Sequence, residues 1–412
     1  MDATLPTEPN EIFLAILAAG THGADLVPLY HQLREAAPQF QADLPRLSNP
    51  WVITRYADDQ LLVRNTSLIK DERQLDLLGR REGKPDGPFL ATMAKMFAFI
   101  GPPRHMALRG LVNRGFTPRS VEKLDPKIAA AVDRILEDEM AEGGMDLAPA
   151  YANRIPLTVI CQLLGVPVEE VPTIAAWSSA FSERGDEGDA PTEESEKTGD
   201  DAARQFAAFI RSLVEERRAN PRDDLLSRLV AIQAETAGLS DDEIVSTAIL
   251  LFQAGHETTA NMIAKGTLAL LHHPEQYALL CAEPERVDNA VEELLRYDTP
   301  VQLTNKFAAA DIPFHDTTIE EGATVTFLWG AVNHDPARYR DPDRLDITRE
   351  DIDHHSFGMG AHFCLGSSLA RLELRHAFRA LSQRLPSLRL AGEPVYKPQL
   401  HVHGLRSLPV AW

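Results

Sequence analysis

The chain has 412 residues, of which 44% are hydrophobic and 25% are charged, and this composition is typical of a soluble globular protein with a large core. Its formal net charge of −20 argues against nucleic acid or an anionic membrane as a partner. The cysteines, Cys161, Cys281 and Cys364, are scattered along the chain, so they indicate neither a disulfide framework nor a zinc site.

The N-terminal residues carry no targeting signal. We expect residues 1–25 to form a loosely ordered tail. Their apolar run, residues 12–19, is too short for a membrane anchor, and the acidic residues around it do not fit a signal peptide. The sequence therefore predicts a cytoplasmic protein that does not cross a membrane.

A first structured region follows this tail. The pattern predicts a helix over residues 26–37, which ends before Pro38, and β-strands over residues 51–56 and 65–69. Residues 71–88 are polar and rich in glycine, so we expect an irregular loop there.

The next helix is predicted to begin within residues 101–109, with proline in its first turn. His105 and Arg109 are four residues apart and therefore share one face of this helix. On spacing alone, such a pair is typical of a solvated helix surface.

The middle of the chain is predicted to be helical. Residues 127–180 show several amphipathic helical patterns, and helical periodicity resumes over residues 205–218. Between them, residues 183–201 are acidic and rich in Gly, Pro, Ser and Thr, so we expect a solvated mobile loop there rather than a metal site. Because no internal repeat or convincing linker is present, we predict a single domain over residues 1–412.

A long helix is predicted over residues 240–271. Ser240 and Glu243 form a capping box at its start, and a proline follows its last apolar residues. Roughly 30 residues at about 1.5 Å each give a helix about 45 Å long, which is enough to cross a molecule of this size.

The middle of this helix, residues 254–259, has the sequence A-G-H-E-T-T. It nearly matches the zinc-binding pattern H-E-x-x-H, but Ala260 replaces the second histidine and excludes that site. Two interpretations remain. Thr258 bonds back to the carbonyl of Ala254 and merely bends the helix, or Glu257 and Thr258 transfer protons.

Residues 285–297 are predicted to form another helix, which contains Glu293 and Arg296. At this i, i+3 spacing the two are typical of an ordinary surface pair, which stabilises a helix by a few tenths of a kcal/mol. Further β-like stretches at residues 323–329 and 399–412 complete a minor β portion.

The strongest pattern is residues 357–366, F-G-M-G-A-H-F-C-L-G, which lead directly into a helix predicted over residues 367–385. Cys364 precedes the start of that helix, where the dipole and the unpaired N–H groups favour a thiolate. A phosphate-binding G-x-G-x-x-G pattern fails because Phe363 occupies its last position, and a nucleophile elbow lacks its final glycine. A small buried hydrophobic cysteine is the plainest alternative.

The spacing F-x-x-G-x-H-x-C-x-G in residues 357–366 resembles the haem-binding loop of the cytochrome P450 family. Other patterns of the family occur in the same order along the chain, namely H-x-x-x-R at residues 105–109, A-G-x-E-T-T at residues 254–259 and E-x-x-R at residues 293–296. The resemblance extends from about Tyr30 to Trp412. It implies a mainly α-helical fold with a small β region, a triangular helical prism in which haem lies between the long helix and the helix after the cysteine loop.

The resemblance implies that Cys364 is the axial thiolate ligand of the haem iron. The other residues that it implies for haem binding are His105, Arg109, Ala254, Gly255, Lys306, Phe357, Gly358, His362 and Gly366. The two haem carboxylates need cationic hydrogen-bond donors, and arginine is suitable because its guanidinium group can donate two parallel hydrogen bonds to one carboxylate. Lys306 stands where the family commonly has such an arginine, and lysine keeps the charge but lacks the planar fork.

By the same resemblance, Glu257 and Thr258 would form the proton relay for oxygen activation, because cleavage of O₂ needs two protons in an otherwise dry pocket. Glu293 and Arg296 would have a structural role, in which they hold the region around Arg344 on the thiolate side of the haem.

The resemblance also implies the cofactor and the partners. Because the chain has no C-x-x-C-H sequence, haem b would be held non-covalently. Electrons would come from NAD(P)H through a separate ferredoxin and ferredoxin reductase, and we expect the protein to be a monomer. We further expect an acidic ferredoxin to face a basic patch. The arginines expected in that patch are Arg104, Arg109, Arg114, Arg371, Arg375 and Arg379.

The implied activity is that of a haem-thiolate monooxygenase, which uses O₂ to hydroxylate or epoxidise a medium-sized, largely apolar organic molecule, such as a polyketide, terpenoid or steroid-like compound. A peroxygenase or an oxidative coupling or desaturating enzyme of the same fold is an alternative, and a haem sensor or carrier without turnover is an alternative of another class. The substrate-pocket residues that we expect are Leu250, Gln253, Gln302, His401 and Val402.

Overall fold

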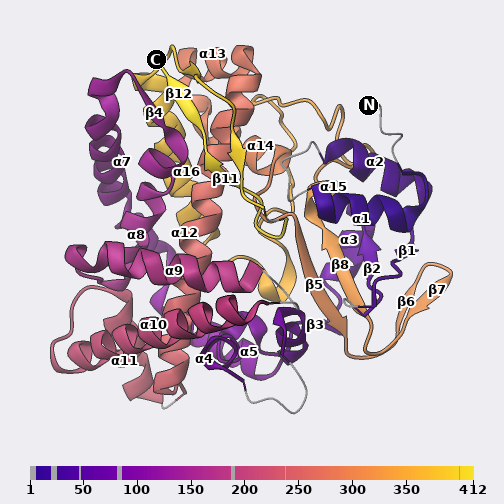
Figure 1. Ribbon diagram of the computed structural model, residues 1–412, viewed down its shortest axis with the longest axis horizontal. Coiled ribbons are helices and arrows are strands. Elements are labelled where there is room, and N and C mark those ends of the chain that lie inside the picture. The colour runs from indigo at the N-terminus through magenta and orange to yellow at the C-terminus, as the bar shows by residue number, and fades with distance from the viewer. Residues whose placement is uncertain are drawn as a thin grey trace. The chain divides into compact units, whose positions relative to one another are not determined.

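The computed structural model describes residues 6–19, 26–45, 48–80, 86–186, 191–236, 238–398 and 400–412 (Figure 1). The chain divides into two compact units, each built from separate stretches of sequence. Unit 1 contains Met1–Leu68, Pro126–Ile155 and Glu257–Trp412, and unit 2 contains Ile69–Asp125 and Pro156–His256. Helices predominate, as the sequence predicts, and strands form a small part of the fold.

Several helices of unit 1 pack into two groups. Helices α14 and α13 pack against α16, and α2 packs against α1 and α15. The bounds of the helices in this unit are α1 Pro9–Ala19, α2 Val27–Ala36, α3 Tyr56–Val63, α7 Asp125–Glu139, α13 Pro274–Ala282, α14 Val287–Tyr297, α15 Trp329–Val332 and α16 Ser367–Arg384.

The expectation of a loose tail over residues 1–25 is wrong for residues 9–19. These residues form α1, and its Ile12, Phe13 and Ile16 are fully buried in a cluster with residues of α2 and β8. Their apolar side chains, spaced to lie on one helical face, outweigh the weak local signal. The remaining described part of this stretch is short, and residues 1–5 and 20–25 lie outside the described residues.

The main sheet of unit 1 has the strand order β1-β2-β8-β5-β3. Its central strand β8 is buried along its whole length, pairs in parallel with β2 and pairs antiparallel with β5. Burial on both faces suits its Val, Thr, Phe and Leu side chains. The bounds are β1 Phe40–Gln41, β2 Trp51–Ile53, β3 Leu68–Ile69, β5 Leu303–Ala308 and β8 Thr324–Leu328, so the strand predicted over residues 51–56 is shorter than expected and runs into α3.

Smaller strand pairings complete unit 1. Strand β12 lies between β4 and β9, β10 pairs with β11, and β6 pairs with β7, all antiparallel. Their bounds are β4 Gly144–Asp146, β6 Ile312–Phe314, β7 Thr317–Ile319, β9 Arg389–Leu390, β10 Val395–Tyr396, β11 Leu405–Ser407 and β12 Pro409–Ala411.

Unit 2 is helical, and α9 and α10 form its most extensive helix pair. A Cβ atom on Gly199 would lie 2.5 Å from the Arg184 side chain, so glycine permits this close packing. The bounds are α4 Pro88–Met93, α5 Arg104–Gly115, α6 Pro118–Glu122, α8 Arg154–Leu164, α9 Val171–Asp186, α10 Glu193–Ala219 and α11 Leu225–Thr236, where α8 begins in the last residues of a unit 1 segment.

The loop predicted over residues 183–201 is largely helix instead. Helix α9 continues to Asp186, and Thr192 caps the start of α10 by accepting a hydrogen bond from the Ser195 N–H. The acidic side chains in the first turn of α10 interact favourably with the helix dipole. Within the loop predicted over residues 71–88, Glu72–Leu78 form a 3-10 helix. Residues 81–85 and 187–190 lie outside the described residues.

Helix α12, Asp241–His272, is the long helix that the sequence predicts, and it passes from unit 2 into unit 1. The capping box is present. The Ser240 hydroxyl accepts a hydrogen bond from the Glu243 N–H, and the Glu243 carboxylate accepts one from the Ser240 N–H. Among the described residues, no helix combines the length and the apolar character that crossing a membrane requires.

Candidate functional site

The cysteine loop, residues 357–366, lies in unit 1 and is shaped by two glycines. Gly358 and Gly360 have φ values of 65° and 68°, a conformation that side chains with a Cβ atom adopt rarely. The Cys364 N–H donates to the Phe357 carbonyl at 2.9 Å, which closes the loop on itself before α16 begins. Cys364 itself is half-buried and carries a reduced thiol. The sequence therefore predicts the position of this thiol at the start of α16 correctly.

The space at Gly366, two residues after the cysteine, is open. A Cβ atom on Gly366, the N-cap residue of α16, would meet no atom within 4 Å, and the neighbouring Phe363 is 41% exposed. Open space beside a thiol at a helix start is what a flat cofactor with a thiolate ligand requires. The residues present therefore fit the haem that the sequence resemblance implies.

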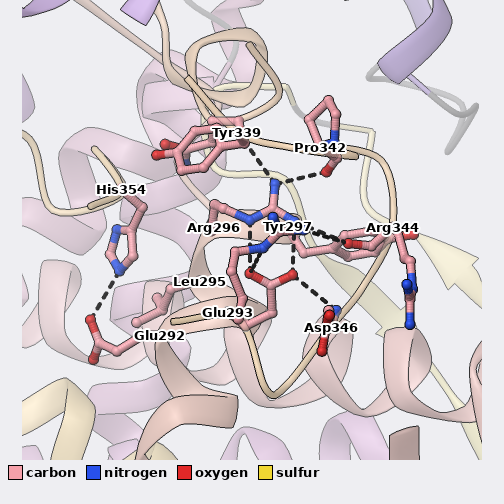
Figure 2. A network of polar contacts seen from close by, with 12 residues as sticks. Glu292, Glu293, Leu295, Arg296, Tyr297, Tyr339, Pro342, Arg344, Asp346 and His354 are labelled. Carbon is pink, nitrogen blue, oxygen red and sulfur yellow. Dashed lines mark hydrogen bonds and ion pairs between the residues drawn. The ribbon is translucent and has the colours of Figure 1, made fainter. Parts of the chain in front are cut away.

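A guanidinium group holds the loop from outside. Arg371 of α16 lies over the Phe357 ring, 4.5 Å from its centroid, and donates two hydrogen bonds to Glu292 at 2.6 and 2.8 Å. The ring of His354 is also 3.2 Å from the Glu292 carboxylate (Figure 2). Burial opposes ionisation of Glu292, but the bonds to Arg371 and His354 outweigh it and lower the pKa of this carboxyl to about 2. Glu292 is therefore an ionised anchor for the loop.

Glu293 and Arg296 form a buried ion pair on α14, rather than the surface pair that their spacing alone suggests. Both side chains are fully buried, and Arg296 donates to the two Glu293 oxygens at 2.8 and 2.9 Å. Arg296 also donates to the carbonyls of Pro342 at 2.8 Å and Arg344 at 3.4 Å (Figure 2). The backbone of Arg344, not its side chain, therefore takes part in this network.

Asn333 links this network to the segment before the cysteine loop. Its carbonyl accepts a hydrogen bond from Arg296 at 2.9 Å, and its side chain bonds the His355 N–H and the Ser356 hydroxyl. The Ser356 hydroxyl in turn donates to the Leu295 carbonyl of α14 at 2.7 Å. No sequence pattern singles out Asn333, because its partners are distant in sequence and a lone asparagine carries no pattern.

The A-G-H-E-T-T segment spans the boundary between the units. Ala254 and Gly255 belong to unit 2, where Ala254 is exposed and a Cβ atom on Gly255 would contact only Ile160, at 3.5 Å. Glu257 and Thr258 belong to unit 1, and both are half-buried. Later in α12, Gly266 lies so close to α16 that an added Cβ atom would be 2.6 Å from the Phe378 ring.

Glu257 has a partner that the sequence analysis missed. Lys397, in the segment after β10, donates to the Glu257 carboxylate at 2.8 Å. The two residues are 140 positions apart, and no local pattern connects them. Only the folded chain brings them together.

His105 lies on α5 in unit 2 and is almost completely buried. Burial, together with the nearby charges of Arg109 and Lys70, lowers its pKa to about 4. Two cationic side chains and a histidine thus gather within unit 2, which confirms that His105 and Arg109 do not form a fully solvated surface.

Lys306 lies on β5 in unit 1 and is also buried. Its ammonium group donates to the Val63 carbonyl at 2.7 Å, and burial, partly offset by Asp59, lowers its pKa to about 8. The same carbonyl would lie 3.1 Å from a Cβ atom on Gly360. Lys306 therefore supports the end of helix α3, which borders the cysteine loop.

The expected substrate-pocket residues fall into two groups. In unit 2, the Gln253 amide is bonded to Ser178 of α9, and Leu250 is half-buried one turn earlier on α12.

The second group lies in unit 1. Gln302 is buried, accepts a hydrogen bond from the Tyr30 hydroxyl at 2.7 Å and donates to the Thr299 carbonyl at 2.6 Å. The amide of Gln302 is therefore engaged inside the protein. The structure brings Gln302 beside His401 and Val402, through a backbone bond from Gln302 to His401 and a β-bridge between Val301 and Val402.

Four arginines of the expected basic patch are paired with carboxylates. In unit 1, Arg371 pairs with Glu292 and Arg375 with Asp288. In unit 2, Arg104 pairs with Glu243 and Arg114 with Glu235. The acidic partners come from other helices, so the arginine spacing within one helix did not reveal them.

Comparison with known proteins agrees with this geometry. The family described as Cytochrome P450 matches residues 192–386. The chain is 39% identical to the vitamin D(3) 25-hydroxylase of Pseudonocardia autotrophica over 413 aligned residues, covering 99% of this chain and 97% of that protein. It is 36% identical to the 6-deoxyerythronolide B hydroxylase of Saccharopolyspora erythraea, covering 96% of this chain and 98% of that protein.

Solved structures show the same fold. The crystal structure of P450BioI in complex with an acyl carrier protein superposes with a TM-score of 0.87 at 33% identity, covering 94% of this chain and 98% of that one. The ligand-free structure of CYP164A2 from Mycobacterium smegmatis superposes with a TM-score of 0.85 at 35% identity, covering 98% and 100%. The chain is therefore an oxidoreductase of the monooxygenase class and belongs to the cytochrome P450 family.

Proposed function

We propose that this protein is a haem-thiolate monooxygenase in which Cys364 would supply the thiolate ligand of a non-covalently held haem b. The observation that carries the proposal is the half-buried Cys364 thiol at the start of α16, beside open space at Gly366. When bound there, the haem supplies the activation of O₂. The residues that would hold the group are those that the sequence resemblance assigns to it. His362, Phe357 and Gly358 belong to the cysteine loop, Lys306 to strand β5, and His105 and Arg109 to helix α5.

The chain's own contribution to the chemistry is to deliver protons. In the proposed relay, Glu257 would take protons from solvent and pass them to the Thr258 hydroxyl, which would donate them into the pocket where O₂ is used. A positioned carboxyl group and a hydroxyl are suitable for such transfer in a pocket that excludes water. Ala254 and Gly255, the small residues that precede this pair, leave room on the same helix.

For the electron source we propose NAD(P)H, acting through a separate ferredoxin and ferredoxin reductase, with the protein working as a cytoplasmic monomer and as one domain. For the substrate we propose a medium-sized, largely apolar organic molecule that is hydroxylated or epoxidised. Relatives named for vitamin D(3) and for 6-deoxyerythronolide B support a steroid-like, terpenoid or polyketide substrate. Leu250 of α12 and Val402 of the C-terminal segment are candidate apolar contacts.

The axial ligand is tested by replacing Cys364 with Ser. We expect the ferrous carbonyl adduct of the wild-type protein to show the red-shifted absorption that a thiolate ligand produces, and the variant to lose it. Cys281→Ser is the matched control, because Cys281 is also a half-buried thiol but lies on α13. A Cys364→Ser variant that keeps the shifted absorption would exclude Cys364 as the ligand.

The relay is tested by replacing Thr258 with Ala. We expect NADPH oxidation to continue while product per NADPH falls and hydrogen peroxide is released, because protons no longer reach the oxygen in order. Thr267→Ala on the same helix is the control, since the Thr267 hydroxyl only bonds back to the Ile263 carbonyl. Unchanged coupling in the Thr258 variant would remove Thr258 from the mechanism.

Two alternatives have distinct signatures. A peroxygenase, or a coupling or desaturating enzyme of the same fold, is less favoured because the Glu257 and Thr258 pair suits the O₂ route. A haem sensor or carrier would consume no NADPH with surrogate redox partners in the presence of any substrate.

A screen of a compound library for spin-state shifts of the haem protein would identify the substrate class.

A further inference from the structure

We propose that Lys397 is a positioning residue for proton delivery, which holds the Glu257 carboxylate in place for its exchange with Thr258. This inference rests on the proposed function, because it takes Glu257 as the acid of the relay. It assigns a role to the C-terminal segment of unit 1, which carries no recognisable sequence pattern.

The ion pair itself lies at the border between core and solvent. The Lys397 ammonium donates to the Glu257 carboxylate at 2.8 Å, and the two side chains are 21% and 19% exposed. A fully exposed pair would be screened by water and salt, and a fully buried pair would have no route to solvent protons. A pair at this depth is shielded enough to be ordered, yet water reaches it.

The backbone that carries Lys397 is fixed against α12. The Lys397 N–H donates to the Gly404 carbonyl at 2.9 Å, so the two ends of the segment between β10 and β11 are joined. Gly404 lies directly against Asn261 of α12, since an added Cβ atom would be only 2.1 Å from the Asn261 side chain. Lys397 therefore extends toward Glu257 from a rigid base.

The next contact along α12 is made by Lys265, one helical turn after Asn261. The buried Lys265 donates to the His403 ring at 3.1 Å and to the Thr299 carbonyl at 3.1 Å, and it is paired with Asp298 at 2.7 Å. Glu257, Asn261 and Lys265 are spaced four residues apart and so occupy one face of α12. Lys397, Gly404 and His403 thus contact that face in turn, and the bond from Lys397 to Glu257 is the contact that lies in the A-G-H-E-T-T segment.

The consequence for the relay follows from geometry. A glutamate side chain has several rotatable bonds, and its carboxylate samples many positions unless a partner selects one. Held by Lys397, the carboxylate keeps one position at the border between core and solvent. In each transfer Glu257 takes one proton from water and gives one proton to the Thr258 hydroxyl, so it returns to its starting state, and Lys397 neither gains nor loses a proton.

The test compares Lys397→Met with Lys397→Arg in the haem-loaded enzyme. We expect Lys397→Met to lower product per NADPH by about threefold to tenfold and to raise the solvent isotope effect, a smaller loss than the ~100-fold or more expected for a missing general acid. Lys397→Arg keeps the positive charge and should restore most of the coupling. The haem spectrum and thermal midpoint of both variants should match those of the wild type.

Lys95→Met is the matched control, because Lys95 also pairs with a carboxylate of α12, Asp242, at 2.5 Å. That pair lies in the first turn of α12, far along the helix from Glu257, so coupling should not change. The proposal is overturned if Lys397→Met leaves coupling and isotope effect unchanged, or if Lys397→Arg is as impaired as Lys397→Met.

Glu257→Gln separates this proposal from the one on which it rests. If Glu257→Gln leaves coupling intact, the relay role of Glu257 fails and the Lys397 proposal falls with it. If Glu257→Gln impairs coupling and Lys397→Met does not, only the Lys397 proposal fails. If both hold, Lys397→Met should have no further effect in the Glu257→Gln background, because the residue acts through Glu257.

Discussion

Arg296 is a single side chain that joins several parts of unit 1. It is fully buried, forms a two-point ion pair with Glu293 and donates to three backbone carbonyls from the region between α15 and the cysteine loop. A guanidinium suits this position because its planar fork has enough N–H groups for all of these acceptors. Removing it would leave the Glu293 charge buried without its main partner.

We therefore expect Arg296→Met to lower the free energy of unfolding by about 3–5 kcal/mol, the range for breaking a buried ion pair from one side. Arg296→Lys should rescue little, because lysine cannot bond both carboxylate oxygens and the carbonyls together. Arg286→Met is the control, since its pair with Glu283 is half-exposed. Urea unfolding measures all three, and equal losses for Arg296→Met and Arg286→Met would contradict the prediction.

His403 is a second residue whose burial has a measurable effect. Burial and the charge of Lys265, partly offset by Asp298, lower its pKa to about 4. The unfolded value is about 6.5, so the unfolded chain binds the proton first, and stability is lost as the pH falls from about 6.5 to about 4.

The predicted loss from this histidine is about 3 kcal/mol across that range, because each pKa unit corresponds to about 1.4 kcal/mol. His403→Gln should therefore show a flatter dependence of unfolding free energy on pH than the wild type between pH 7 and pH 4. Urea titrations at several pH values would measure the difference. Parallel curves for the two proteins would show that His403 does not titrate in this way.

Helix α16 follows the cysteine loop directly and contains Arg371, the arginine that holds this loop. We expect Arg371→Met to weaken haem retention and to lower the unfolding free energy by roughly 1–2 kcal/mol, because it removes a two-point bond to Glu292 and a cation–π contact with Phe357. Arg375→Met is the control on the same helix, since its partner Asp288 is largely exposed. Transfer of haem to apomyoglobin would measure retention, and equal haem loss from both variants would count against a clamp at Arg371.

The elements with strong local signals were predicted well from the sequence. Helix α12 begins with a capping box, and both α12 and α16 have a clear apolar period and a proline soon after their last residue. Both helices occur close to the predicted bounds. Helix α1 is predicted as a tail, because its stability comes from packing of apolar side chains against distant segments. The start of α10 is predicted as a loop, because its polar and acidic composition outweighs the one local helix signal, the Thr192 cap. Tertiary burial, which local pattern does not contain, decides such cases.

For the site residues too, prediction from the sequence depends on a recognisable local pattern. Cys364, Glu293 and Arg296 stand in recognisable spacings, so the sequence could single them out. Lys397 and Asn333 do not, since each acts on residues far away in sequence and each is an ordinary residue type for a surface. Long-range polar partners of this kind are fixed only by the fold.

At the scale of the whole molecule, the net charge of −20 governs how an acidic redox partner approaches. Four arginines of the predicted basic patch are paired with carboxylates, so long-range repulsion should prevail. We expect reduction by an acidic ferredoxin to become faster as ionic strength rises from about 10 mM to about 100 mM, where the Debye length falls from about 30 Å to about 10 Å. Stopped-flow measurement with an uncharged reductant as control tests this, and a rate that falls with salt would instead indicate local attraction.

Strand β4 has a bearing on how the chain reaches its native state. Its partner β12 follows it by most of the sequence, and the Leu408 N–H bonds the Asp146 side chain across 262 positions. During synthesis β4 cannot pair with β12 until the intervening residues have left the ribosome. Closing so large a loop is slow, and this late step exposes an unpaired edge to aggregation. Yield of the native enzyme on expression should therefore depend on growth temperature and chaperone supply.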